Sequence, residues 1–122
     1  MNLLENLGIE IQTLSKTTTI VSLPVTKKIL QPLGFVHGGI NAVLAETAAS
    51  LGANENLPSD QVAVGVNITT HHLRAVTSGE LVATAIPIHI GRHLQTWEVK
   101  ITNNRQVTSI STVTLNAINK QK

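Results

Sequence analysis

Apolar residues fill one long stretch of the chain and alternate with polar residues over most of the remainder. From Gly38 to Asn54 the sequence reads GGINAVLAETAASLGAN, in which Glu46 is the single charged residue. A segment that is apolar nearly all round is typical of a buried helix. We therefore predict one long buried helix that begins at the glycine pair and closes within residues 52–56.

Segments rich in β-branched residues lie on both sides of this helix. Residues 9–14 and 18–24 predict a hairpin with its turn near Ser15 and Lys16. Four further β-rich segments follow the helix, at residues 61–74, 80–90, 93–102 and 106–116. They are separated by turn-forming residues at 77–79, 91–92 and 103–104. Because short turns join successive strands, we predict an antiparallel sheet and an α+β fold.

The predicted helix has two separate stripes at 100° per residue. The stripe expected to face the core consists of Ile40, Leu44, Thr47, Ala48 and Leu51. The other stripe consists of Gly39, Val43, Glu46 and Ser50. It therefore combines a glycine N–H at a helix start, a carboxylate and a hydroxyl.

Glu46 has two interpretations. A lone acid in a buried helix is costly unless something pairs with it, because desolvation disfavours its charge. It is then either structural, bonded to backbone or to an arginine, or catalytic. We favour catalysis because the same stripe carries the other polar groups.

The first strand after the helix alternates Val62, Val64, Val66 and Ile68 with smaller or polar residues. We expect this valine face to meet the helix. The same parity brings Thr70, His72 and Arg74 to the helix side and leaves His71 on the opposite face. A β-bulge would break this count. A satisfied core histidine is the alternative interpretation of His72.

Composition limits the class of protein. The 122 residues predict a single domain over 1–122, without cysteine and therefore without disulfides or cysteine-based metal sites. We expect a cytoplasmic protein, since no signal peptide or membrane-spanning stretch is evident. Nine Lys and Arg against seven acidic residues are scattered, and aromatics are nearly absent. This argues against a nucleic-acid partner and favours a small anionic ligand. We expect no membrane partner, because no stretch reaches the length of a membrane helix.

The most specific pattern surrounds the predicted helix start. The His37-Gly38-Gly39 motif has Gln31 six residues before its histidine, Glu46 nine residues after it and Ser50 thirteen residues after it. Together with one helix wrapped by an antiparallel sheet, this resembles the hotdog-fold acyl-CoA thioesterases of the PaaI-like superfamily. The resemblance covers residues 9–116. It is strongest to the branch with Glu-type 4-hydroxybenzoyl-CoA and 1,4-dihydroxy-2-naphthoyl-CoA thioesterases, and it implies a sheet of five to six strands.

The resemblance implies hydrolysis of an acyl-CoA thioester, with an acyl group that we expect to be aromatic. The Gly39 backbone N–H is expected to polarise the thioester carbonyl, helped by the helix dipole, and Gln31 to bind or orient it. Glu46 acts either as a nucleophile through a mixed anhydride or as a general base on water. Both routes remain open.

The remaining catalytic candidates have supporting roles. Ser50 is expected to hold the attacking water. His37 is expected to position the loop or to donate near the carbonyl. His72 is expected to contact the thiolate side or the acyl group. By the same resemblance, the sites lie at dimer interfaces of a homotetramer built as a dimer of dimers.

Coenzyme A contacts are expected at Arg74 and at the Gly91-Arg92-His93 turn, which resembles the nucleotide-binding turn of the family. A solvated surface arginine is the alternative at both positions. The resemblance implies neither a metal nor a cofactor, and the histidines near this turn lack carboxylate neighbours in sequence. Trp97 is expected in the core or at an interface.

Two other functions share this fold. One is a hydratase or dehydratase, which usually carries a differently placed histidine with an acid. The other is a non-catalytic acyl-CoA-binding or sensor protein, whose known forms join a DNA-binding segment for which we expect no room here.

Overall fold

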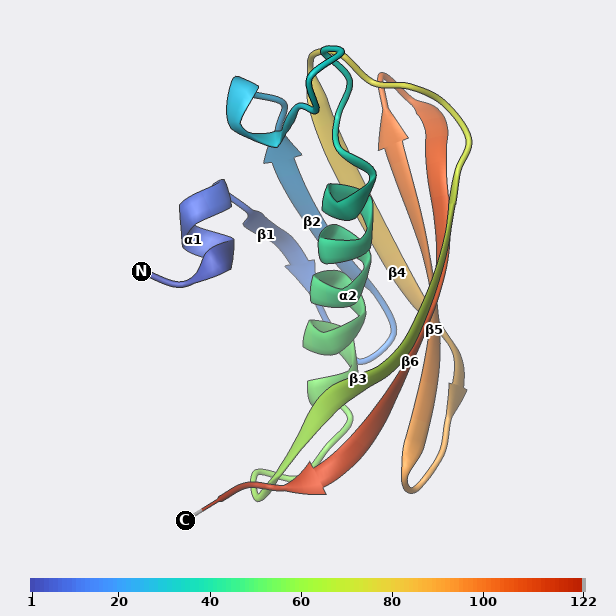
Figure 1. Cartoon of the computed structure of the whole chain (residues 1–122). Coiled ribbons are helices and arrows are strands. Elements are labelled where there is room, and N and C mark those ends of the chain that lie inside the picture. The colour runs from blue at the N-terminus through green and yellow to red at the C-terminus, as the bar shows by residue number, and fades with distance from the viewer. Residues whose placement is uncertain (122) are drawn as a thin grey trace.

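The chain forms a curved sheet that wraps one long helix (Figure 1). The computed structural model describes residues 1–121. Its elements in order are α1 (Leu3–Leu7), β1 (Glu10–Leu14), β2 (Thr19–Pro24), η1 (Lys27–Ile29, a 3-10 turn), α2 (Gly38–Asn54), β3 (Gln61–His72), β4 (Glu80–Ile90), β5 (Leu94–Asn103) and β6 (Gln106–Asn119). The strands pair antiparallel in the order β1-β2-β4-β5-β6-β3. The predicted α+β arrangement is confirmed.

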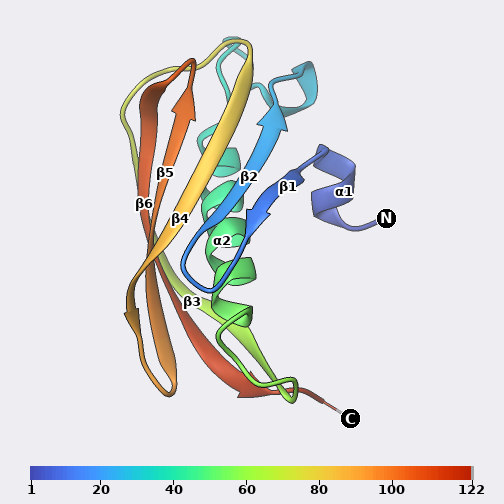
Figure 2. The same ribbon diagram turned by 180° about the vertical axis from the view of Figure 1, so that it is seen from behind.

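The view from behind shows β2 along one side of α2, with β1 outside it at the sheet edge, while β3 runs past the other side of the helix (Figure 2). Strand β3 is therefore an edge strand of the sheet. Within residues 1–121 no helix has both the length and the apolar character needed to cross a bilayer.

The predicted element boundaries agree closely with the observed ones. The helix covers the predicted stretch, and each predicted strand has its counterpart. The turn between β5 and β6 places Asn104 and Arg105 at φ 51° and 66°. Positive φ at both central residues is what a tight two-residue hairpin requires. The short helix α1, capped by the Asn2 side chain, was not predicted.

Small residues let α2 lie close to the sheet. A β-carbon on Gly52 would lie 2.6 Å from Cη2 of Trp97 and 2.7 Å from Oγ1 of Thr19. Trp97 is fully buried, and its indole N–H donates to Oε1 of Gln95 at 2.9 Å. The Gln95 amide in turn donates to the carbonyl of Ala53 at 3.1 Å. The expectation that Trp97 belongs to the core is confirmed.

The core face of α2 differs in part from the predicted stripe. Leu44 and Ala48 are buried as predicted, but Ile40, Thr47 and Leu51 are only half-buried. The buried positions are Asn41, Leu44, Ala45, Ala48, Ala49, Gly52 and Ala53. The helix therefore turns its alanine-rich side to the sheet, because alanine permits the closest approach.

The expectation of a buried Glu46 is wrong for the single chain, where this side chain is exposed. The sheet covers one side of α2 and leaves the stripe with Gly39 and Glu46 open. An apolar helix can thus signal a surface left free by its own sheet as well as a buried one.

A bulge in β3 changes which residues face the helix. The pairing with β6 shifts between Gly65 and Asn67, so Val66 is the extra residue. Before the bulge, Ala63 and Gly65 face α2 and Val64 is 39% exposed, and Val66 in the bulge is 59% exposed. The predicted valine face is therefore wrong there.

Beyond the bulge the parity is reversed. Ile68 packs against the core, and Thr70 bonds the buried Ser111 across the strands at 2.8 Å. His72 follows on the same face, toward α2, and His71 lies on the opposite face. The predicted face of each histidine is confirmed, although the alternation of residues from which it was predicted did not include the bulge.

Candidate active site

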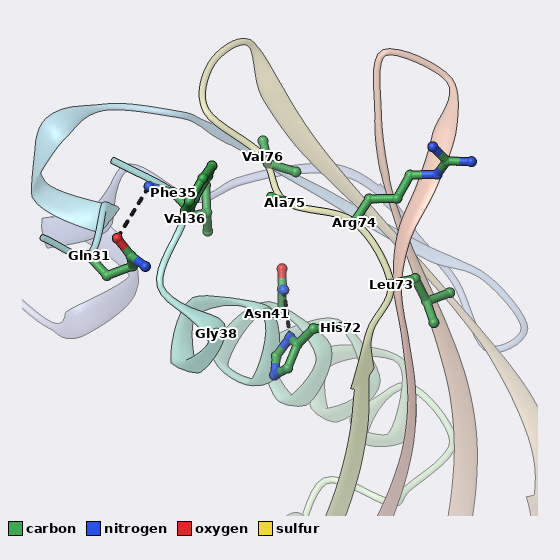
Figure 3. A pocket seen from close by; sticks show the side chains of 10 residues that line it. All are labelled: Gln31, Phe35, Val36, Gly38, Asn41, His72, Leu73, Arg74, Ala75 and Val76. Atoms are coloured by element: carbon green, nitrogen blue, oxygen red, sulfur yellow. Dashed lines mark hydrogen bonds between the residues drawn. The ribbon is translucent and has the colours of Figure 1, made fainter. Parts of the chain in front are cut away.

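A pocket of about 360 Å³ opens at the N-terminal end of α2 (Figure 3). Its walls come from the loop before α2, the first turns of α2, the end of β3 and the segment after β3. Three predicted site residues, Gln31, His72 and Arg74, lie on these walls. Much of the apolar lining comes from Phe35, Val36, Leu73 and Val76. A pocket with an apolar lining and a few polar groups is typical of a small-molecule site.

Gln31 is held by a turn of its own loop. Its backbone N–H donates to the carbonyl of Phe35 at 2.7 Å, and its carbonyl accepts from the Gly34 N–H at 2.9 Å. Gly34 has φ 91°, a conformation that favours glycine. The side-chain oxygen of Gln31 accepts from the backbone N–H groups of Leu33 and Phe35. With its oxygen engaged in this way, the amide nitrogen is the group free to donate to a ligand.

His37 caps the start of α2. Its Nδ1 accepts from the backbone N–H of Gly39 at 2.9 Å. A carbonyl that uses the Gly39 N–H must therefore displace this imidazole. Gly38, the first residue of α2, lies on the pocket wall. The helix start thus brings the backbone of Gly38 and the positive end of the helix dipole to the pocket, while the Gly39 N–H is held by His37.

His72 projects from the end of β3 to the first turn of α2. Its Nδ1 lies 3.0 Å from the amide nitrogen of Asn41 (Figure 3). Its Nε2 faces Gly38, where an added β-carbon would lie 3.0 Å from both Nε2 and Cε1. The imidazole thus fills the space that a side chain at residue 38 would need.

Glu46 lies two turns along α2 and is not part of the pocket wall. Its carboxylate contacts Gly65 at the β3 bulge, where no β-carbon would fit beside Oε2. At 1.5 Å per residue, Glu46 lies roughly 10 Å along the helix from the glycine pair. One chain therefore places the acid apart from Gln31, His72 and the helix start.

Ser50 lies one turn beyond Glu46 and is half-buried. The stripe of Gly39, Glu46 and Ser50 is distinct from the core face, as predicted. Along it, the carboxylate and the hydroxyl are neighbours at i and i+4.

The predicted coenzyme A contacts are not brought together in one chain. Arg74 is exposed at the pocket. The turn of Gly91, Arg92 and His93 joins β4 to β5 at the opposite end of the molecule (Figure 1). In this turn the Gly91 N–H donates to the Leu94 carbonyl at 2.8 Å, and both Arg92 and His93 are exposed.

Two residues of the site region were missed from the sequence. Asn41 is 8% exposed and bonds His72, and Gly65 makes room for Glu46. The available signals were a polar residue within an apolar helix and a glycine within a valine-rich strand.

Comparison with known proteins places the chain in a family. The profile described as the thioesterase superfamily matches residues 33–110, more than half of the chain. The chain is 44% identical over 106 residues to a 1,4-dihydroxy-2-naphthoyl-CoA hydrolase of Listeria monocytogenes, covering 87% of this chain and 86% of that protein. It is 38% identical over 99 residues to a proofreading thioesterase of Cronobacter turicensis, covering 81% and 72% respectively.

The fold agrees with a solved thioesterase. The crystal structure of a thioesterase from Haemophilus influenzae superimposes with a TM-score of 0.91 and 37% identity, covering 98% of this chain and 84% of that chain. The chain thus belongs to the thioesterase superfamily, and it is a thioester hydrolase with the hotdog fold.

Proposed function

We propose that this enzyme hydrolyses an acyl-CoA thioester to the free acid and coenzyme A, at sites shared between two copies of the chain. The observation that carries the proposal is the separation of the pocket from the acid. Gln31 and His72 lie on the pocket wall, whereas Glu46 is exposed about two helical turns away. A second chain that covers the open side of α2 would bring its own Glu46 to this pocket.

The edge of the sheet supports such a pairing. Strand β3 is at the edge, close to Glu46, and Val64 and Val66 on it are exposed. An open edge strand with exposed apolar side chains is a surface suited to association. We propose a homodimer through this edge and a tetramer of two such dimers.

The helix start is proposed to bind the thioester carbonyl. Backbone N–H groups at Gly38 and Gly39 and the amide nitrogen of Gln31 would donate to its oxygen, where negative charge develops. His37 then either yields its bond to the Gly39 N–H or positions the loop. The absence of side chains at the two glycines allows the acyl carbon to approach the backbone closely.

Glu46 of the other chain is proposed to drive the hydrolysis by one of two routes. As a general base it removes a proton from water, the water oxygen attacks the carbonyl carbon, and the carbon–sulfur bond breaks to release the thiolate. As a nucleophile its oxygen displaces the thiolate to form a mixed anhydride, which water then hydrolyses. In either route Ser50, one turn away, holds the water.

The routes differ in where labelled oxygen appears. In a single turnover in ¹⁸O-labelled water, attack of water on the glutamyl carbon of an anhydride would leave label in the Glu46 carboxylate. The general-base route would place it in the released acid alone. Label found by mass spectrometry in the peptide containing Glu46 would therefore identify the anhydride route.

Coenzyme A is proposed to be held by Arg74 and by the turn of Gly91, Arg92 and His93. Guanidinium groups bind phosphates well, and Arg74 is exposed at the pocket. The turn lies far from the pocket of its own chain, so it would serve a site formed with a neighbouring copy. No metal or cofactor has a role in this chemistry.

An aromatic acyl group is the proposed substrate class. The relative in Listeria is named for a naphthoyl thioester, and a relative in Arabidopsis thaliana that is 37% identical over 121 residues carries a similar name. Phe35, Val36 and Leu73 supply apolar surface on the pocket wall.

A panel of coenzyme A thioesters tests the proposal. Release of free thiol should be fastest with benzoyl and naphthoyl derivatives and slower with medium-chain acyl groups. Binding without turnover of any member would instead indicate a sensor. Addition of water to an enoyl thioester would indicate a hydratase.

A further inference from the structure

Asn41 is a polar residue on the buried face of α2, and the chemistry proposed above gives it no role. It is 8% exposed, and the only hydrogen bond of its side chain within residues 1–121 is to Nδ1 of His72, at 3.0 Å. Burying an amide without a partner is costly, so the contact stabilises both groups. The two side chains come from different elements, α2 and β3, and meet at the pocket (Figure 3).

We propose that Asn41 is a positioning residue that holds His72 in the tautomer with its proton on Nε2. A neutral imidazole has one N–H donor and one acceptor nitrogen, and the bond made by one nitrogen decides the state of the other. The structure directs the amide nitrogen of Asn41 at Nδ1 and its oxygen into the pocket (Figure 3). Because an amide nitrogen can only donate, Nδ1 is the acceptor and Nε2 carries the hydrogen.

The consequence is a donor at the start of α2. Nε2 of His72 faces Gly38, within 3.0 Å of where a β-carbon would stand. A hydrogen on this nitrogen joins the backbone N–H groups of the helix start. In the reaction, on which this consequence rests, it donates to the carbonyl oxygen or to the departing sulfur as either becomes negative.

A reversed amide of Asn41 would give His72 the opposite role at the helix start. With the amide reversed, its oxygen would accept from Nδ1–H, and Nε2 would present a lone pair to the helix start. A lone pair there repels a developing oxyanion. The identity of residue 41 therefore decides whether His72 assists the reaction or opposes it.

Nitrogen NMR of the full-length ¹⁵N-labelled protein tests the tautomer without substrate. Long-range ¹H–¹⁵N correlations separate a protonated ring nitrogen from an unprotonated one, and the His72→Gln variant assigns the signals. In the neutral ring of the wild-type protein we expect Nε2 protonated and Nδ1 bare. The reverse pattern, or an equal mixture, would overturn the proposal.

A variant of Asn41 provides a second test. Asn41→Asp replaces the donor with acceptors and should reverse the pattern, moving the hydrogen to Nδ1. It should lower kcat by about 10-fold or more, with KM little changed, because a transition-state donor is lost. Asn104→Asp introduces the same charge on an exposed turn residue and should change neither readout. An unaltered His72 pattern in a folded Asn41→Asp protein would contradict the proposal.

These two tests distinguish a failure of this inference from a failure of the proposed function. The NMR spectrum is recorded on the protein without substrate, so it tests the tautomer of His72 whether or not the proposed substrate is correct. If Asn41→Asp does not fold, the wild-type spectrum alone still decides the tautomer.

Discussion

The carboxylate of Glu46 lies against the backbone of Gly65, in a space that a β-carbon at residue 65 would occupy. This contact is made where the pairing of β3 with β6 shifts at the bulge. Any larger residue at 65 would push the acid away from the strand edge. The relationship suggests that the bulge and the glycine together set the position of the acid.

Replacing Gly65 with alanine should therefore displace Glu46 without unfolding the protein. The clash is with the free end of a flexible side chain, so the free energy of unfolding should change by no more than about 1 kcal/mol. Because catalytic groups lose activity when moved by about 1 Å, kcat should fall by about 10- to 10²-fold. Urea unfolding and steady-state kinetics measure the two quantities.

The double variant Gly65→Ala/Glu46→Ala is the control for this prediction. If Gly65 acts through Glu46, adding the alanine at 65 to a protein without the acid should cost little more. Full additivity of the two losses in kcat would show that Gly65 matters for another reason.

Glu46→Ala should leave a folded protein with kcat lower by about 10²-fold or more, because it removes a group that acts in the transition state. Glu46→Gln, which keeps the shape and removes the charge, should lose a similar amount. Near wild-type kcat on the best substrate would make Glu46 structural. Circular dichroism of both variants verifies that the fold is kept.

Gly52→Ala should weaken the core and leave the chemistry of each folded molecule alone. The new methyl group would lie 2.6 Å from the Trp97 ring and 2.7 Å from Thr19. Such overpacking costs about 1–3 kcal/mol of unfolding free energy. Urea unfolding monitored by circular dichroism gives the value.

The Trp97→Phe variant, which has a smaller ring at residue 97, provides the comparison for Gly52→Ala. It lacks the ring atoms that crowd residue 52, so the penalty of Gly52→Ala should be smaller in that background. An equal penalty in both backgrounds would mean that the crowding at Trp97 is not its cause.

The active form should be an oligomer, most simply a tetramer of two dimers, because one chain keeps Glu46 apart from its pocket. Sedimentation at assay concentration measures the state. Two charges placed on the β3 edge by Val64→Asp/Val66→Asp should shift it toward monomer and abolish turnover. A monomer with full activity would contradict the shared site.

Local patterns were sufficient for most of the fold. The glycine pair and the apolar run fixed the bounds of α2, and turn residues marked the ends of the strands. The five residues of α1 are too few for a helical period to be recognised. The bulge at Val66 reverses strand parity through backbone geometry, which alternation of side chains does not record.

The sequence predicted several residues of the candidate site, but it did not predict how these residues are arranged in space. The motif identified Gln31 and the helix start, and strand parity brought His72 to them. The exposure of Glu46 was missed because, in the sequence, an apolar helix face that its own sheet leaves open looks the same as one that the sheet covers. Asn41 was missed because its partner lies 31 residues away and is known only from the packing of β3 on α2.

Mixing two inactive variants tests most directly whether two chains share each site. Glu46→Ala and Gln31→Ala proteins are combined and their subunits are allowed to exchange. A heterodimer then has one site with both defects and one site with neither, so it should recover about half of the wild-type activity per dimer. If verified exchange restores no activity, each site is built within one chain, and the shared-site account is wrong.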